Sequence, residues 1–139
     1  MMRIEILNTG TELLLGSTRN THGTWIGQEL VKLGLRVQRQ VTVPDGIAIE
    51  EALNEATHRS DVVLVTGGLG PTSDDITREA TAKVLGVELI EDEESLRSLH
   101  EFFTKRNKPM VDANLKQAQN LVGADILPNN NGTAPGIYA

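Results

Sequence analysis

The stretch Thr66-Gly67-Gly68-Leu69-Gly70-Pro71-Thr72-Ser73-Asp74-Asp75 decides the fold that we predict for this chain. It follows an apolar, mostly β-branched run at 62–65. It precedes three apolar residues with the i, i+4, i+8 spacing of one helix face, Ile76, Ala80 and Val84. The stretch is therefore predicted to be a turn from a strand into a helix. Its three glycines and the proline suit a backbone that adopts positive φ and lets a ligand approach its amides.

Two carboxylates give this turn its predicted chemistry. Amides at the positive end of a helix favour a bound phosphate. Asp74 and Asp75 stand at the same place and would repel a bare phosphate unless a divalent cation lay between them. The turn is therefore predicted to be a site for metal-assisted phosphate chemistry. The alternative is that one aspartate caps the helix and the glycines only shape the turn.

Length and composition limit the classes of protein that this chain can belong to. Its 139 residues suit about one domain, and we take residues 1–139 as that domain. The formal charge of −6, with no cluster of Lys or Arg, argues against nucleic acid or an anionic membrane as a partner. The absence of cysteine excludes disulfides and thiolate metal sites. The start at 1–6 reads as a strand, because Arg3 and Glu5 would fall inside the apolar core of a signal peptide, and no later run approaches membrane-spanning length. We therefore expect a soluble cytoplasmic protein.

Strands and helices are predicted to alternate before the turn. A strand at 4–9 is followed by a loop at 10–16 whose polar opening could face a ligand. A helix then begins at a cap, Asn20 or Thr21, and ends at Gly34. Its apolar face carries Trp25, Ile26, Leu30 and Leu33, so we expect Trp25 in the core, and the alternative is a stacking platform for a ligand. A strand at 35–43, a helix with apolar residues at 49, 53 and 56, and the strand at 62–65 complete the series. This order predicts an α/β fold with a mainly parallel sheet covered on both faces.

A further aspartate, Asp45, follows the end of the predicted strand at 35–43. In open α/β sheets, ligands bind at the carboxyl ends of the strands. Asp45 and Asp75 follow successive strands and can converge only in such a topology. The alternative is that Asp45 is a plain helix cap.

The pattern changes after Gly86. We expect a short edge strand at 87–90, a helix that stops before Asn107, a short helix from about 112 to 121, and a strand at 124–127. A loop at 129–136 leads to an incipient strand at 137–139. An ending inside a strand suggests a piece of a longer protein, and the alternative is a disordered terminus.

Several motifs together resemble a known family. The segments 66–70 and 74–80 are similar to the motif of the molybdopterin-binding domain family, which includes MogA, MoaB, MoeA and gephyrin. The segments 10–16, 20–21, 114–118 and 132–136 narrow the resemblance to the N-terminal domain of CinA, the competence/damage-inducible protein family.

The resemblance implies a three-layer α/β/α sandwich with a mostly parallel, five-stranded sheet that has one antiparallel strand. It also implies that Asp45 and Asp75 form an acidic pair near a pterin phosphate and a divalent metal. CinA proteins are associated with hydrolysis of ADP-ribose to AMP and ribose 5-phosphate, and the family is commonly dimeric or trimeric, so a homo-oligomer is expected. A later loop of the family lies beyond residue 139, so the domain is expected to be truncated.

The working hypothesis is metal-dependent hydrolysis of ADP-ribose. Asp45 and Asp75 are the candidate catalytic residues and, with Asp74, the candidate ligands of Mg²⁺, Mn²⁺ or Co²⁺. The candidate ligand-binding residues are Gly10, Thr11, Glu12, Asn20, Thr66, Gly67, Gly68, Gly70, Lys116, Gly132 and Thr133. A non-catalytic module that binds molybdopterin or a nucleotide is the alternative, and a purely structural or oligomerisation domain is a third reading.

Overall fold

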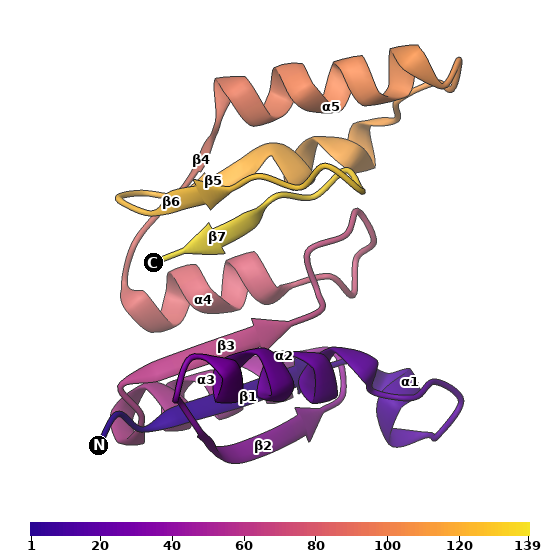
Figure 1. Ribbon diagram of the computed structural model, residues 1–139. Coiled ribbons are helices and arrows are strands. Elements are labelled where there is room, and N and C mark those ends of the chain that lie inside the picture. The colour runs from indigo at the N-terminus through magenta and orange to yellow at the C-terminus, as the bar shows by residue number, and fades with distance from the viewer. The chain divides into compact units, whose positions relative to one another are not determined.

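The computed structural model describes residues 1–139, which form two compact units (Figure 1). The first unit is Met1–Gly68 and the second is Leu69–Ala139. The boundary falls inside the glycine turn that was predicted to join a strand to a helix. Both flanking elements are present, the strand β3 (Val62–Thr66) before the turn and the helix α4 (Thr77–Leu85) after it.

A parallel three-stranded sheet organises the first unit. Its order is β2-β1-β3, with β1 (Ile4–Thr9) fully buried between β2 (Val37–Val43) and β3. The register pairs Thr9 with Val43 and Asn8 with Thr66, so all three strands end at the same edge. The α/β class and the parallel sheet are thus confirmed.

Two helices connect these strands. The helix α2 (Thr21–Lys32) leads from β1 to β2, and α3 (Ile47–Arg59) leads from β2 to β3. Because the two crossovers run in opposite directions along the sheet, right-handed connections place the helices on opposite faces. A short helix, α1 (Thr11–Leu14), replaces part of the loop predicted at 10–16, since the Leu13 amide closes a turn onto the Gly10 carbonyl at 3.1 Å.

The prediction for Trp25 is wrong. Its side chain is 62% exposed, and only Gly23 of α2 is buried. The helix turns this glycine toward the sheet, where an added Cβ would lie 2.7 Å from Gln40 Oε1 and 3.3 Å from Asn8 Oδ1. Ile26 and Leu30, which lie three and seven residues after Gly23, are half-buried on the same face. The apolar periodicity therefore located the helix correctly, but it placed Trp25, at the margin of the inward face, in the core.

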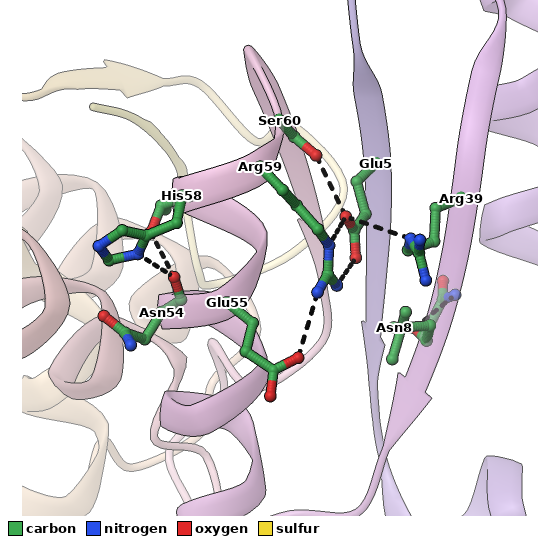
Figure 2. A network of polar contacts seen from close by, with 10 residues as sticks. Glu5, Asn8, Arg39, Asn54, Glu55, His58, Arg59 and Ser60 are labelled. Carbon is green, nitrogen blue, oxygen red and sulfur yellow. Dashed lines mark hydrogen bonds and ion pairs between the residues drawn. The ribbon is translucent and has the colours of Figure 1, made fainter.

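A buried carboxylate ties α3 to the sheet. Glu5 on β1 is 1% exposed and accepts hydrogen bonds from Arg59 Nε at 2.9 Å, Arg59 Nη2 at 2.6 Å and Ser60 Oγ at 3.1 Å. Figure 2 shows Arg59 and Arg39 reaching Glu5 from opposite sides, and the Arg39 Nε lies 4.0 Å from the carboxylate. The hydrogen bond from Arg59 is the main reason that the pKa of Glu5 lies below its usual value.

The second unit contains three helical segments. The helix α4 buries Ala80 and Ala82 and ends at Gly86, whose φ of 68° is left-handed. The helix α5 (Glu93–Lys105) begins at Asp92, whose carboxylate accepts a hydrogen bond from the Ser95 amide at 2.8 Å. The 3-10 helix η1 (Asp112–Ala118) is shorter than the helix predicted at about 112–121.

Four short strands in this unit form two separate pairs. The strand β4 (Leu89–Glu91) pairs with β5 (Gln119–Leu121), and β6 (Asp125–Leu127) pairs with β7 (Gly136–Tyr138), both antiparallel. The strand count differs from the single five-stranded sheet that the resemblance implied, because these three-residue strands form two local ladders. None of the helices in the structure combines the length and apolar character needed to cross a membrane.

Candidate functional site

The carboxyl edge of the three-stranded sheet gathers several predicted site residues of the first unit. The Gly10 amide donates to the Val43 carbonyl at 3.1 Å and so joins the ends of β1 and β2. Asp45 follows β2 by two residues, and Gly67 follows β3 directly. The parallel topology thus places the ends of β1, β2 and β3, with the residues that follow them, along one edge.

Asp45 is held by the short helix α1. Its Oδ2 accepts hydrogen bonds from the Thr11 amide and from Thr11 Oγ1, both at 3.1 Å. Its own amide donates to Thr11 Oγ1 at 3.2 Å. The N-cap of α3 is Gly46, which makes no side-chain cap. Asp45 is therefore not the cap of α3 that the alternative expected, and its carboxylate is oriented by Thr11 at the start of α1.

The end of β3 is fixed to β1 by side chains. Thr66 Oγ1 donates to Asn8 Oδ1 at 3.1 Å, and Thr9 Oγ1 donates to the Thr66 carbonyl at 2.9 Å. Gly67 has a φ of 91°, and a Cβ there would lie 2.5 Å from the Thr9 carbonyl oxygen. Gly68 also has positive φ, 72°. Only glycine therefore fits at position 67, for reasons of both conformation and space.

Asn20 and Glu12 have local roles in the first unit. The Asn20 side chain caps α2 by accepting a hydrogen bond from the Gly23 amide at 3.0 Å, as one of the two readings expected. The Glu12 carboxylate folds over Gly10, where an added Cβ would meet Oε1 at 2.6 Å. Gly10 has a φ of 147°, so a side chain there would be strained as well as crowded.

Asp75 is held within the second unit in the same manner as Asp45. Its Oδ2 accepts hydrogen bonds from the Thr72 amide at 2.9 Å and from Thr72 Oγ1 at 2.6 Å, and the Gly70 backbone also bonds the carboxylate. The N-cap of α4 is Ile76 and not Asp75. Burial raises the pKa of Asp75, but the bonds from Thr72 and Gly70 and the charge of Lys116 outweigh it, so the pKa lies below its usual value.

The side chains of Lys116 and Arg78 donate hydrogen bonds to three backbone carbonyl oxygens of segment 69–75. Lys116 Nζ on η1 donates to the Thr72 carbonyl at 3.0 Å and the Asp75 carbonyl at 2.5 Å, and it pairs with Glu79 Oε1 at 3.4 Å. Arg78 Nη2 donates to the Leu69 carbonyl at 2.7 Å. Lys116, predicted as a phosphate cation, thus contacts backbone oxygens of the turn in this structure.

Gly132 and Thr133 line a hollow beside α5. This hollow of about 530 Å³ is also lined by Leu99 and Phe102 of α5. Thr133 Oγ1 accepts a hydrogen bond from Gln117 Nε2 at 2.6 Å, which links the loop to η1. The structure therefore joins these two residues to α5 and η1, all within the second unit.

The predicted acidic pair is divided between the units. Asp45 belongs to the first and Asp75 to the second, while Asp74 is exposed. The structure contains no group of three or more His, Asp or Glu side chains that could hold a metal ion. Carboxylate oxygen nevertheless suits a hard cation such as Mg²⁺, which often takes only one or two protein carboxylates and completes its shell with water and phosphate. A cation shared by both aspartates stays a prediction.

Sequence reasoning missed two residues that shape the turn, Thr72 and Arg78. The spacing Thr72-x-x-Asp75 is that of a side chain folding back on an amide, and it could have indicated the pairing. No sequence signal separated Arg78 from an ordinary exposed helix arginine.

Comparison with protein families gives one match that spans nearly the whole chain. The family described as "Probable molybdopterin binding domain" matches residues 5–139. A CinA-like protein from Akkermansia muciniphila is 51% identical over 136 residues, which are 98% of this chain and 33% of that protein. The chain thus spans about a third of the length of this curated relative.

Solved structures agree with the sequence relatives. The protein CinA from Thermoplasma acidophilum has a TM-score of 0.87 at 35% identity, covering 98% of this chain and 80% of that one. The molybdopterin biosynthesis enzyme MoaB from Thermus thermophilus has a TM-score of 0.58 at 26% identity, covering 87% and 79% of the two chains.

Proposed function

Because the chain belongs to the molybdopterin-binding domain family, and within it to the CinA group, we propose that it hydrolyses ADP-ribose to AMP and ribose 5-phosphate with the help of a divalent cation. The observation that carries the proposal is the matched setting of two aspartates. In each, Oδ2 accepts hydrogen bonds from both the amide and the hydroxyl of one threonine, Thr11 for Asp45 and Thr72 for Asp75. Ligating carboxylates are characteristically oriented by such secondary hydrogen bonds.

The proposed roles follow from this arrangement. Asp45 and Asp75 would hold the cation, with Asp74 as an exposed neighbour. A bound divalent cation would supply neutralisation of the phosphate oxygens and acidification of water. The backbone of the turn at Gly67 and Gly68 would lie beside the diphosphate at the sheet edge, and Gly68, which has no side chain, would allow a close approach. Hydrolysis breaks one bridging P–O bond, adds water oxygen to that phosphorus and leaves AMP and ribose 5-phosphate.

The direct test is formation of AMP by the purified chain. ADP-ribose is incubated with Mg²⁺, Mn²⁺ or Co²⁺, or with a chelator, and AMP is quantified. Asp75→Asn should lower the rate by at least tenfold, equivalent to about 1.4 kcal/mol of barrier. Asp112→Asn changes an exposed aspartate on η1 and serves as the control. Full activity in Asp75→Asn would refute the assigned role.

A double substitution tests whether the two aspartates serve one cation. If they do, either single change already abolishes binding of the cation, and Asp45→Asn with Asp75→Asn falls no further than the worse single variant. Independent roles instead predict that the two fold-losses multiply.

The second candidate function is a non-catalytic module that binds a pterin or nucleotide phosphate. The observation that favours it is the family match itself, whose description names molybdopterin binding. Ligand that raises the melting temperature while no AMP forms would support this function. Light scattering of the same sample would test the homo-oligomer that we also propose.

A further inference from the structure

Arg78 is a buried cation that makes only one hydrogen bond. It lies in the first turn of α4 and is 1% exposed. Its Nη2 donates to the Leu69 carbonyl at 2.7 Å, whereas Nε and Nη1 have no hydrogen-bond partner. A guanidinium keeps its charge in proteins, so these donors cannot be neutralised by loss of a proton. Burying a charged group with unpaired donors is unfavourable, so an arginine at this position must supply an interaction that offsets part of the cost.

The carboxylates near Arg78 compensate only in part for the burial of its charge. Burial lowers the pKa of Arg78, and the carboxylates of Glu79 and Asp75 raise it, with burial dominant. Glu79 Oε2 is itself buried without a hydrogen-bond partner. A methionine or leucine would fill the same space without desolvating a charge. What an apolar side chain could not supply is a donor to the Leu69 carbonyl.

The two cations act at opposite ends of one segment. Arg78 binds the carbonyl of Leu69, its first residue, and Lys116 binds the carbonyls of Thr72 and Asp75, in its middle and at its end. The Leu69 carbonyl and the Gly70 amide belong to one peptide group, so the hydrogen bond from Arg78 also orients the Gly70 amide that bonds the Asp75 carboxylate. The Thr72 amide donates to the same carboxylate at 2.9 Å. The shape of segment 69–75 thus depends on donors outside it.

We infer that Arg78 is a positioning residue, which fixes the Leu69 carbonyl and thereby sets the geometry in which segment 69–75 presents Asp75. The consequence for catalysis rests on the proposed function, while the effect on the segment does not. Arg78 touches no reacting atom in this scheme and acts through the backbone of the turn.

The test compares three variants of the 139-residue chain by amide hydrogen exchange. Arg78→Met removes the charge and keeps the length, and Arg78→Lys keeps the charge and one donor. Arg97→Met makes the same change on α5, where the arginine side chain is 70% exposed. In Arg78→Met the Gly70 and Thr72 amides should exchange roughly tenfold faster or more, as expected for loss of a charged hydrogen bond. Arg78→Lys should restore most of the protection, and Arg97→Met should match the wild type.

The kinetic readout separates positioning from general stability. In Arg78→Met, kcat for AMP formation should fall about tenfold with KM for ADP-ribose little changed, because a misplaced group affects the reacting geometry more than binding. If the wild type forms no AMP, the proposed function fails and the exchange data still decide the role of Arg78.

Two results would overturn the inference. One is a folded Arg78→Met variant whose Gly70 and Thr72 amides exchange at the wild-type rate. Should that variant not fold, NMR of the wild type decides, through the scalar coupling across the hydrogen bond from Arg78 Nη2 to the Leu69 carbonyl. Absence of that coupling contradicts the role.

Discussion

Replacing Gly70 by alanine should displace the Asp75 carboxylate. A Cβ at position 70 would lie 2.6 Å from Asp75 Oδ2, whereas ordinary van der Waals contact begins at 3.4 Å. Gly70 is not among the glycines with positive φ, so alanine can adopt its backbone conformation. The structure therefore predicts one effect of the substitution, a steric collision with Asp75, which is a candidate catalytic residue.

The magnitude follows from the hydrogen bonds that Asp75 would lose. Its Oδ2 receives the Thr72 amide at 2.9 Å and Thr72 Oγ1 at 2.6 Å, and the Gly70 backbone bonds the carboxylate too. Hydrogen bonds to charged groups contribute roughly 1.5–3 kcal/mol each when fully made, but water replaces part of this at a half-buried side chain. Alanine also returns about 0.4–1 kcal/mol by restricting the unfolded chain. We therefore expect a net loss of about 2 kcal/mol in the free energy of unfolding.

Urea unfolding monitored by circular dichroism measures this loss, and AMP formation measures the effect on the site. Gly27→Ala is the matched control, because nothing lies within 4 Å of a Cβ at this helical glycine. That change should be neutral or stabilise the chain by about 0.5–1 kcal/mol.

A double-mutant cycle decides whether the collision is the cause. In an Asp75→Ala background the Cβ of Ala at position 70 meets no carboxylate, so Gly70→Ala should lose its destabilising effect there. The reasoning is refuted if Gly70→Ala is as stable and active as the wild type, or if it destabilises both backgrounds equally.

Three further predictions concern stability. Glu5→Gln leaves the partly exposed Arg59 without its buried carboxylate and should lower the free energy of unfolding by about 2 kcal/mol, measured in urea. For Asp92 the pKa is lowered by its hydrogen bonds from Ser95, so its stabilising effect is present above the unfolded pKa and is lost as pH falls through the lower folded pKa. The stability gap between wild type and Asp92→Asn should accordingly be larger at pH 7 than under acid conditions in urea titrations. Gly67→Ala combines a φ of 91° with a backbone collision at 2.5 Å and should cost more than about 2 kcal/mol or prevent folding, as judged by the soluble yield and urea midpoint.

The central turn and the parallel sheet could be predicted because local chemistry dictates them. Gly67 and Gly68 have the positive φ that their sequence suggested, and β1, β2 and β3 alternate with helices as the apolar periodicity indicated. Parallel order then places Asp45 at the carboxyl edge without further information. These features depend on residues close together in sequence, or on topology alone.

The remaining features depend on contacts that periodicity does not encode. The pairing of Thr11 with Asp45 joins residues 34 positions apart, and Lys116 reaches Asp75 across 41 positions. Trp25 has the spacing of a core residue, yet the close approach of Gly23 to the sheet decides which side of α2 faces inward. Gly70 serves the close approach of a carboxylate where positive φ had been expected.

The hydrogen bonds between Asp75 and its own turn bear on which ligands this turn can accept. A phosphate oxygen that binds the amides of Gly70 and Thr72 must compete with the Asp75 carboxylate, which already bonds them. Because this carboxylate belongs to the same turn, its effective concentration is at least the millimolar value typical of short flexible linkages. The affinity for a bare anion equals the intrinsic affinity multiplied by the fraction of time that the carboxylate is away from these amides, so it is lower when the carboxylate is mostly bound there. The segment would thus discriminate against free inorganic phosphate and in favour of a ligand that arrives with a cation able to draw the carboxylate away.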